Sequence, residues 1–452
     1  MSITFAMWIM IFSILSWLAL FRRPIWGVSL YMFVFFVFPR LWYWGQGNFM
    51  MSIRFSLLAS LILLFGVLFL RSAPMKLEKH IDQDENNNLS DQTPVFYFSN
   101  QGFISIIILL IVINYFFVHF VLAGGSEISQ ATFVLSLKYL LLFYLIHRAI
   151  QTSDDFIIVL FTIVLCLGYL GYQVKMNGVG DMLHGRLERI PIAGAMSSNL
   201  FASLLVLFLP FIGALFFTTQ KIYLKLILML LLPFILNLLF LLNSRGAYLG
   251  TIISGIFLTL LSRKRERRIV LIAFMLSIVA VSFLAENQDI FDRFQSIFVT
   301  SEDRDSSASS RIIFWSSAIE MISDYPLGSG GDSFKRVHGL KYTSKHGVTV
   351  NRAVHNGFLS TACDWGVQGL FLKLLLIYAL ITKAYQATKY QLHVQGLYKE
   401  SFLIKTCISG ILGFLVCAIF TTVLDEEWLI WMLAILYSYI KLVQNNSFRL
   451  TH

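Results

Sequence analysis

Charged side chains are scarce in this sequence. Only 13% of its 452 residues are Asp, Glu, Lys or Arg, whereas 57% are hydrophobic. Soluble globular proteins carry about twice this charged fraction, and the mean hydropathy here is +0.73. The composition therefore excludes an ordinary soluble domain and indicates a protein embedded in a membrane.

Cysteine is also scarce, with four residues in the whole chain, and no pair has the spacing of a metal site or of a disulfide framework. Internal repeats are missing, and so are matching spans broken by Gly or Pro, which would indicate a transporter built from inverted repeats. We interpret the cysteines as small apolar packing residues. They are Cys166, Cys363, Cys407 and Cys417.

What the chain does contain is a series of long apolar runs. A helix needs about 20 apolar residues to cross a bilayer, and the runs are close to that length. We therefore predict an all-α polytopic membrane protein with about 12–13 transmembrane helices. The candidate spans are 3–20, 25–42, 53–71, 101–122, 131–149, 156–174, 199–217, 222–242, 246–261, 269–285, 366–384, 402–421 and 428–443.

Lysine and arginine are distributed unevenly among the loops between these spans. Since cytoplasmic loops are enriched in both residues, we predict that the richer set of loops, which includes residues 263–268, is cytoplasmic. This bias also accounts for most of the net charge of +10, so nucleic-acid binding is not needed to explain it. The long polar loop 286–365 is then expected outside the cytoplasm, in the periplasm or the extracytoplasmic space.

The prediction divides the chain into four parts. Residues 1–174 form the N-terminal transmembrane helices, and residues 175–285 form further helices that include a Ser-Arg-Gly hairpin. Residues 286–365 form one large periplasmic loop with short helices, and residues 366–452 form the C-terminal transmembrane helices.

The large loop contains two residues suited to chemistry. Arg311 has a planar, permanently charged fork that binds phosphate oxygens in pairs, and His355 can transfer protons near neutral pH. We predict a helix from Arg311 to Asp324, with Ser309 and Ser310 as its N-cap. His355 is expected to open a second short helix that leads into the next span.

Four short blocks of sequence occur in a specific order around this loop. They are Arg186-Leu187 followed by Asn199; Ser244-Arg245-Gly246-Ala247-Tyr248-Leu249-Gly250; Ser310-Arg311 with Trp315 and Pro326-Leu327-Gly328-Ser329-Gly330; and His355-Asn356-Gly357-Phe358-Leu359 followed by Gly366 and Gly369. With these blocks, the chain resembles the O-antigen ligase and polymerase superfamily, including its O-antigen ligase-related domain, over roughly residues 175–380.

The resemblance implies a metal-independent transferase without a cofactor, acting on a glycan carried by undecaprenyl diphosphate. A ligase passes the glycan to an acceptor glycolipid such as lipid A–core, whereas a surface-polysaccharide polymerase passes it to a second lipid-linked repeat. The blocks do not separate these two activities. Membrane lipids complete the expected partners. A flippase for lipid-linked oligosaccharides is an alternative of another class, but it gives no reason for a loop with Arg and His.

The resemblance assigns the catalytic roles to Arg245, Arg311 and His355. Two guanidinium groups near the lipid headgroups could stabilise the charge that develops on the departing diphosphate. His355 would accept the proton of the attacking sugar hydroxyl, or position that hydroxyl. Simpler roles remain open at this stage: a snorkelling anchor for Arg245, an ion pair with nearby acids for Arg311, and a structural role for His355.

Further residues are expected to bind the diphosphate or the glycan. Arg186 and Arg189 lie on another predicted outer loop, where they could equally meet anionic headgroups. Lys138 is expected in the outer third of its helix, where snorkelling is an equal alternative. Asn356 belongs to the His-Asn-Gly block. Two other histidines of the large loop, His338 and His346, compete with His355 for the role of base.

Three other features receive a structural interpretation. Asp303-Arg304-Asp305 is similar to the Asp-x-Asp motif of metal-dependent glycosyltransferases, but that motif uses a nucleotide sugar, which is not expected outside the cytoplasm. We therefore expect no metal site. The acidic run 425–427 is interpreted as a capping or acceptor-side feature. Lys373 falls inside a predicted span, and the spans offer no carboxylate to pair with it.

Overall fold

The computed structural model describes residues 3–42, 44, 52–70, 101–183, 185–194, 197–264, 266–268, 270–271, 275, 306–394 and 398–450. Within these residues the chain is helical almost throughout, which confirms the predicted all-α polytopic class. The exception is one small antiparallel hairpin, in which Asp181 pairs with Glu188 and Leu183 pairs with Arg186.

The elements of the first half are α1 (Ile3–Phe21), α2 (Ile25–Phe36), the 3-10 turn η1 (Pro39–Leu41), α4 (Phe55–Phe69), α5 (Gln101–Phe116), the π-helix η3 (Phe117–Leu122), α6 (Glu127–Ala149), α7 (Ser153–Asn177), β1 (Asp181–Leu183) and β2 (Arg186–Glu188). Those of the second half are α8 (Ser198–Phe208), α9 (Pro210–Thr218), α10 (Ile222–Leu242), α11 (Arg245–Leu261), α14 (Ser306–Asp324), the π-helix η5 (Phe334–His338), α15 (Gly339–Thr343), the 3-10 turn η6 (Ser344–His346), α16 (Gly357–Val394), α17 (Tyr398–Phe420) and α18 (Glu427–Leu450).

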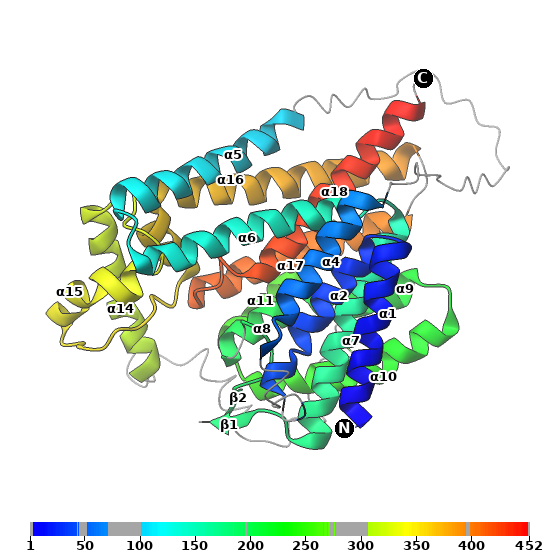
Figure 1. The fold of residues 1–452 in the computed structure, drawn as a ribbon, viewed down its shortest axis with the longest axis horizontal. Helices are drawn as coiled ribbons and strands as arrows, with labels where there is room; N and C mark the ends of the chain where they lie inside the picture. Colours follow the sequence, from blue (N-terminus) through cyan, green and yellow to red (C-terminus); the bar gives the residue numbers. More distant parts are fainter. Residues whose placement is uncertain are drawn as a thin grey trace.

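Among the described residues, eight helices are long and apolar enough to cross a membrane, and three further apolar helices are shorter. Most of the predicted span 269–285 lies outside the described residues. The predicted span 428–443 is α18, which is helical and deeply buried but less apolar because it carries tryptophans, tyrosines and Lys441. Figure 1 shows the long helices packed side by side, with the hairpin at the lower edge and α14 and α15 at the left.

The turn between α10 and α11 confirms the predicted hairpin. Asn243 adopts a left-handed conformation (φ 46°, ψ 51°), which ends α10 and lets α11 begin at Arg245. Small residues then line the face of α11 that meets α17, which lets the two helices approach closely. A Cβ atom at Gly250 would lie 2.7 Å from the carbonyl oxygen of Gly413, so the two helix backbones are in direct contact at this point.

Helix α16 contains a break that joins the polar loop to a transmembrane segment. Gly366 has φ 80° and ψ 167°, so the helix is interrupted after Trp365. The carbonyl oxygen of Trp365 is satisfied by side-chain amides, because Asn114 of α5 donates to it at 2.9 Å and Gln368 at 3.2 Å. The segment before the break is the short helix predicted to follow His355, and the segment after it is the predicted span.

The polar loop has a small core of its own. Helix α14 begins at Ser306, so the predicted N-cap at Ser309 and Ser310 is wrong, and both serines lie inside the helix. Its apolar face does not lie on the surface but packs against η5, α15 and the first segment of α16. The buried members of this cluster are Phe314, Ala318, Met321, Phe334, Tyr342, Val354 and Cys363.

Backbone hydrogen bonds attach this small core to the membrane helices. The amide of Ser329 donates to Cys363, and the amide of Gly330 donates to Asp364 at 3.0 Å. The Asp364 carboxylate in turn accepts from both the amide and the hydroxyl of Ser333. The chain after α14 is therefore fixed along α16, and α14 lies near the N-terminus of α11 and the C-terminus of α17.

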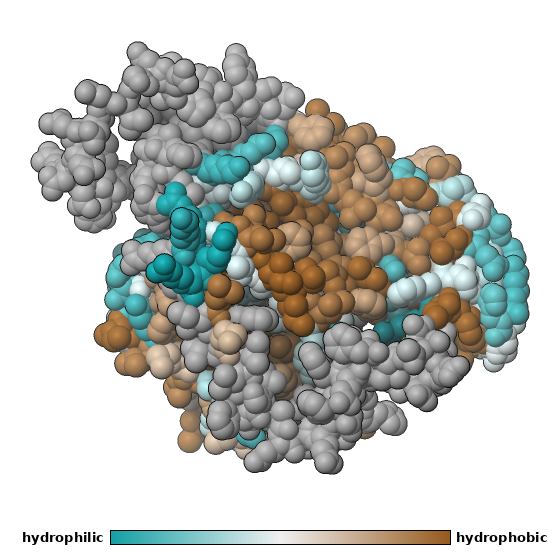
Figure 2. Space-filling model, turned by 180° about the vertical axis from the view of Figure 1, so that it is seen from behind, coloured by the Kyte–Doolittle hydropathy of each residue, from teal (hydrophilic) through white to brown (hydrophobic). Residues whose placement is uncertain are grey.

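The surface agrees with a membrane environment. Figure 2 shows a broad and continuous hydrophobic area on one face of the molecule, with hydrophilic residues at its two sides. Large apolar side chains on several helices are more than half exposed, among them Ile3, Phe69, Ile106, Leu230 and Tyr378. Such a surface is suited to lipid and not to water.

Candidate functional site

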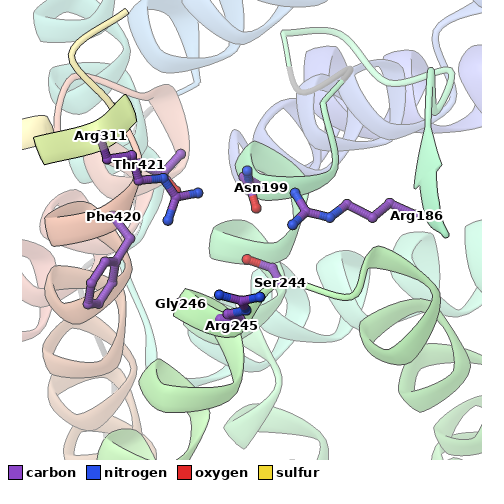
Figure 3. A pocket seen from close by; sticks show the side chains of 8 residues that line it. All are labelled: Arg186, Asn199, Ser244, Arg245, Gly246, Arg311, Phe420 and Thr421. Carbon is purple, nitrogen blue, oxygen red and sulfur yellow. The ribbon is translucent and has the colours of Figure 1, made fainter. Parts of the chain in front are cut away.

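One pocket brings together three of the arginines predicted from the sequence. Its lining residues come from β2, α8, the start of α11, α14 and the end of α17, and about 350 Å³ of space, part of it open to solvent, lies between them. Figure 3 shows the side chains of Arg186, Arg245 and Arg311 around this space. The full lining is Arg186, Asn199, Ser244, Arg245, Gly246, Arg311, Phe420 and Thr421.

Arg245 forms the floor of the pocket because of the turn that precedes it. The left-handed Asn243 reverses the chain, so that Ser244 and Arg245 stand at the N-terminus of α11. The positive end of the helix dipole and the guanidinium group therefore act on the same space, and both favour an anion there. The close packing of α11 on α17 fixes this floor beside Phe420 and Thr421.

Arg311 enters the pocket from the opposite wall, on the second turn of α14 (Figure 3). Burial and the neighbouring charge of Arg245 lower the pKa of Arg311. Among the described residues, no carboxylate forms an ion pair with Arg311; the acids considered as its partners, at 302, 303 and 305, lie outside them. Two like charges that face one space are stabilised when a polyanion lies between them.

Arg186 and Asn199 form the third wall. Arg186 opens β2 and extends toward Asn199, which lies in the first turn of α8 (Figure 3). The amide of the Asn243 side chain donates to the carbonyl oxygen of Gly185 at 3.2 Å, and this bond ties the hairpin to the turn that carries Arg245. Three cationic side chains from three separate parts of the sequence therefore surround one cavity.

His355 lies next to this group but does not line the pocket. Its ring centre is 6.2 Å from that of Phe314, on the same helix as Arg311. Burial, followed by the charges of Arg311 and Arg352, lowers the pKa of His355 to about 4, so the imidazole is neutral at pH 7. Its φ of 56° is unusual for a residue other than glycine, and strained backbone of this kind often marks a functional position.

Comparison with known proteins gives the family. Residues 226–374 match the family model described as O-Antigen ligase. Residues 226–374 therefore form a domain of the O-antigen ligase superfamily. The protein is thus a multi-pass membrane protein of the ligase/polymerase type, which transfers glycans. Among curated proteins, none matches this sequence.

The match to the O-antigen ligase model covers only part of the pocket. Arg245, Arg311 and His355 fall inside residues 226–374, whereas Arg186 and Asn199 precede them, and Phe420 and Thr421 follow. Residues that precede and follow the matched segment in the sequence therefore also line the pocket.

The two competing histidines of the loop lie in other surroundings. The ring of His338 stacks on Tyr325, with 4.7 Å between the ring centres. His346 is exposed, and its Nε2 atom lies 3.5 Å from a carboxylate oxygen of Glu320. None of the three histidines lines the pocket, but the charge of Arg311 acts on His355, and His355 therefore stays the candidate base.

The remaining candidates lie away from the pocket or have structural contacts. The Oδ1 atom of Asn356 accepts from the amides of Phe358 and Leu359, and it therefore caps the first segment of α16. Arg189 is exposed and lies 3.2 Å from a carboxylate oxygen of Asp181. Lys138 is exposed on α6.

One ion pair near the site was not predicted from the sequence. Lys373 of α16 donates to Asp425, whose other carboxylate oxygen accepts from the Thr361 hydroxyl at 2.6 Å. Asp425 lies in the turn after α17, outside the predicted spans, and this is why a search within the spans did not find it. No sequence pattern relates Lys373 to Asp425, because the two residues are far apart along the chain.

A metal site was not predicted for this O-antigen ligase relative. Among the residues that the structure describes, no three His, Cys, Asp or Glu side chains are grouped so that they could hold a metal ion. The Asp-x-Asp sequence at 303–305 lies outside those residues.

The low pKa of His355 leads to a test by pH. Arg352 is exposed and contributes to the low value, so Arg352→Ala should raise the pKa of His355. If neutral His355 is the base, kcat/KM for glycan transfer falls as the pH drops through its pKa. We expect this acidic limb to move to higher pH in Arg352→Ala, with little change at pH 7. Lys335→Ala, an exposed cation of the same loop, is the matched control. An unmoved limb would contradict the assignment.

Proposed function

We propose that the protein transfers a glycan from undecaprenyl diphosphate to an acceptor on the periplasmic side of the bacterial inner membrane. The observation that carries this proposal is the convergence of Arg186, Arg245 and Arg311 on one pocket, with a neutral histidine beside Arg311. A lipid-linked diphosphate is an anion that sits at headgroup level and matches three guanidinium groups.

The chemistry follows from these groups. The acceptor hydroxyl oxygen attacks the anomeric carbon of the glycan while the bond from that carbon to the diphosphate oxygen breaks. The arginines stabilise the negative charge that gathers on the leaving diphosphate, and His355 takes the proton of the hydroxyl. Direct displacement inverts the anomeric carbon. Arg189 and Lys138 are proposed to meet the glycan or lipid headgroups away from the pocket.

No step of this reaction needs a metal ion, because the arginines provide the positive charge. We propose a ligase whose acceptor is lipid A–core or a similar glycolipid. A polymerase of surface polysaccharide, which uses a second lipid-linked repeat as acceptor, is the alternative within the same superfamily.

Acceptor dependence distinguishes these activities. The protein in liposomes is given the lipid-linked glycan with and without lipid A–core, in excess EDTA. A ligase consumes the donor only when lipid A–core is present, a polymerase lengthens the donor alone, and a flippase changes only the sidedness of the donor. We expect transfer that depends on the acceptor and persists in EDTA. Loss of activity in EDTA, restored by Mg²⁺ or Mn²⁺, would refute metal independence.

A further inference from the structure

Glu188 connects two walls of the pocket. Its Oε2 atom accepts from the backbone amide of Ser198 at 2.8 Å, and its Oε1 atom accepts from the Ser198 hydroxyl at 2.6 Å. Glu188 ends β2, and Ser198 begins α8. Both oxygens of one carboxylate are therefore bonded to a single residue of another element, and this arrangement fixes direction as well as distance.

Each end of this connection lies next to a residue of the pocket. Residues i and i+2 of a strand point to the same face, so Glu188 and Arg186 share the outer face of β2, while Leu187 between them is 2% exposed. Asn199 directly follows Ser198 in α8. The Glu188–Ser198 contact therefore sets the separation between Arg186 and Asn199 across the cavity.

Glu188 lies where a carboxylate can cap a helix. Ser198 is in the first turn of α8, where free backbone amides and the helix dipole stabilise a negative charge. Ser197 is the N-cap, and its hydroxyl accepts from the amide of Leu200, so Glu188 and Ser197 share the capping of this helix. Each strand of the hairpin has only three residues, so contacts from outside the hairpin help to hold it in place.

We propose that Glu188 is a positioning residue of the transferase: it holds Arg186 against Asn199 and thereby shapes the diphosphate site. This inference rests on the proposed function, because Arg186 must act on the donor for its position to matter. Without the carboxylate, β2 keeps the Asn243–Gly185 bond and its buried apolar side but loses this side-chain connection to α8, so the distance from Arg186 to Asn199 is less constrained. A small displacement of a binding group lowers the rate of an enzyme strongly.

The test is a double-mutant cycle measured on protein inserted in membranes. Glu188→Ala should lower kcat/KM for the lipid-linked donor roughly ten- to a hundredfold. Glu188→Gln keeps an acceptor for the Ser198 amide and should recover most of the activity. In an Arg186→Ala background, Glu188→Ala should add little, because groups that act as one unit are not additive. Glu127→Ala, an exposed acid in the first turn of α6, is the control with wild-type rates expected.

Several results would overturn the proposal. A purely structural Glu188 would lower the amount of inserted protein and leave the kinetics of the remainder unchanged. If the double variant loses kcat/KM by the product of the two single losses, Glu188 acts independently of Arg186. Wild-type rates in Glu188→Ala with an impaired Arg186→Ala would refute this inference alone, whereas wild-type rates in Arg186→Ala would refute the role of Arg186 in the proposed function as well. If Glu188→Ala fails to insert, Ser198→Ala removes one of the two bonds and should give a smaller loss in the same direction.

Discussion

Replacement of His355 by alanine is expected to leave the protein folded and inserted but nearly inactive. The ring is half-buried beside Phe314 and Arg311, at the edge of the pocket, and its pKa of about 4 keeps it free to accept a proton at pH 7. General-base catalysis typically contributes about 10²- to 10⁴-fold to a rate. The loss should appear in kcat for glycan transfer by purified protein.

The other histidines of the loop provide matched controls for this measurement. His338→Ala and His346→Ala remove the same chemical group from the same small subdomain, away from the pocket, and both should retain transfer. Wild-type-like transfer by a well-inserted His355→Ala protein would reject His355 as the base, and the two controls would then become the candidates.

The second large effect is expected at Arg245 and Arg311. A lysine keeps the positive charge but loses the planar, paired donors of the guanidinium group. If both residues hold the same diphosphate, Arg245→Lys and Arg311→Lys should each lose about 3–4 kcal/mol of transition-state stabilisation, or roughly a hundred- to thousandfold in rate. The double variant should be little worse than the worse single variant, because the two groups act as one unit.

Simple membrane anchors would behave differently, since lysine snorkels as well as arginine. Transfer rates are measured on purified lipid-linked donor, with insertion checked for each variant. Arg336→Lys is the control, because Arg336 lies on the same polar loop but pairs with Asp332 outside the pocket. Near-normal rates in both single variants would remove the main physical support for the mechanism.

The sequence predicted those features of the protein that depend on local pattern. Apolar runs predict helices because the bilayer sets their length. The sequence also predicted the turn before Arg245, because Asn243 and Ser244 interrupt an apolar stretch. Membership in the O-antigen ligase superfamily is confirmed by the match at residues 226–374.

Features that depend on distant pairing could not be read from the chain. Strands of three residues, such as β2, are too short to show alternation, so the hairpin that carries Arg186 was not predicted. The Lys373–Asp425 pair joins residues 52 positions apart, and the Glu188–Ser198 contact depends on the packing of β2 beside α8. The predicted start of α14 was wrong, because serine is favourable as an N-cap but is also tolerated inside a helix.

The contact between Gly250 and Gly413 also limits how such an enzyme can diverge. With the backbones of α11 and α17 touching at Gly250, one turn beyond the pocket, this contact has no room for larger side chains, and the two helices cannot move apart independently of it. The wall on α14 belongs to a separate small core, attached to α16 mainly by the segment 326–333. Substitutions in the small core behind Arg311 can therefore accumulate without disturbing the contact between α11 and α17.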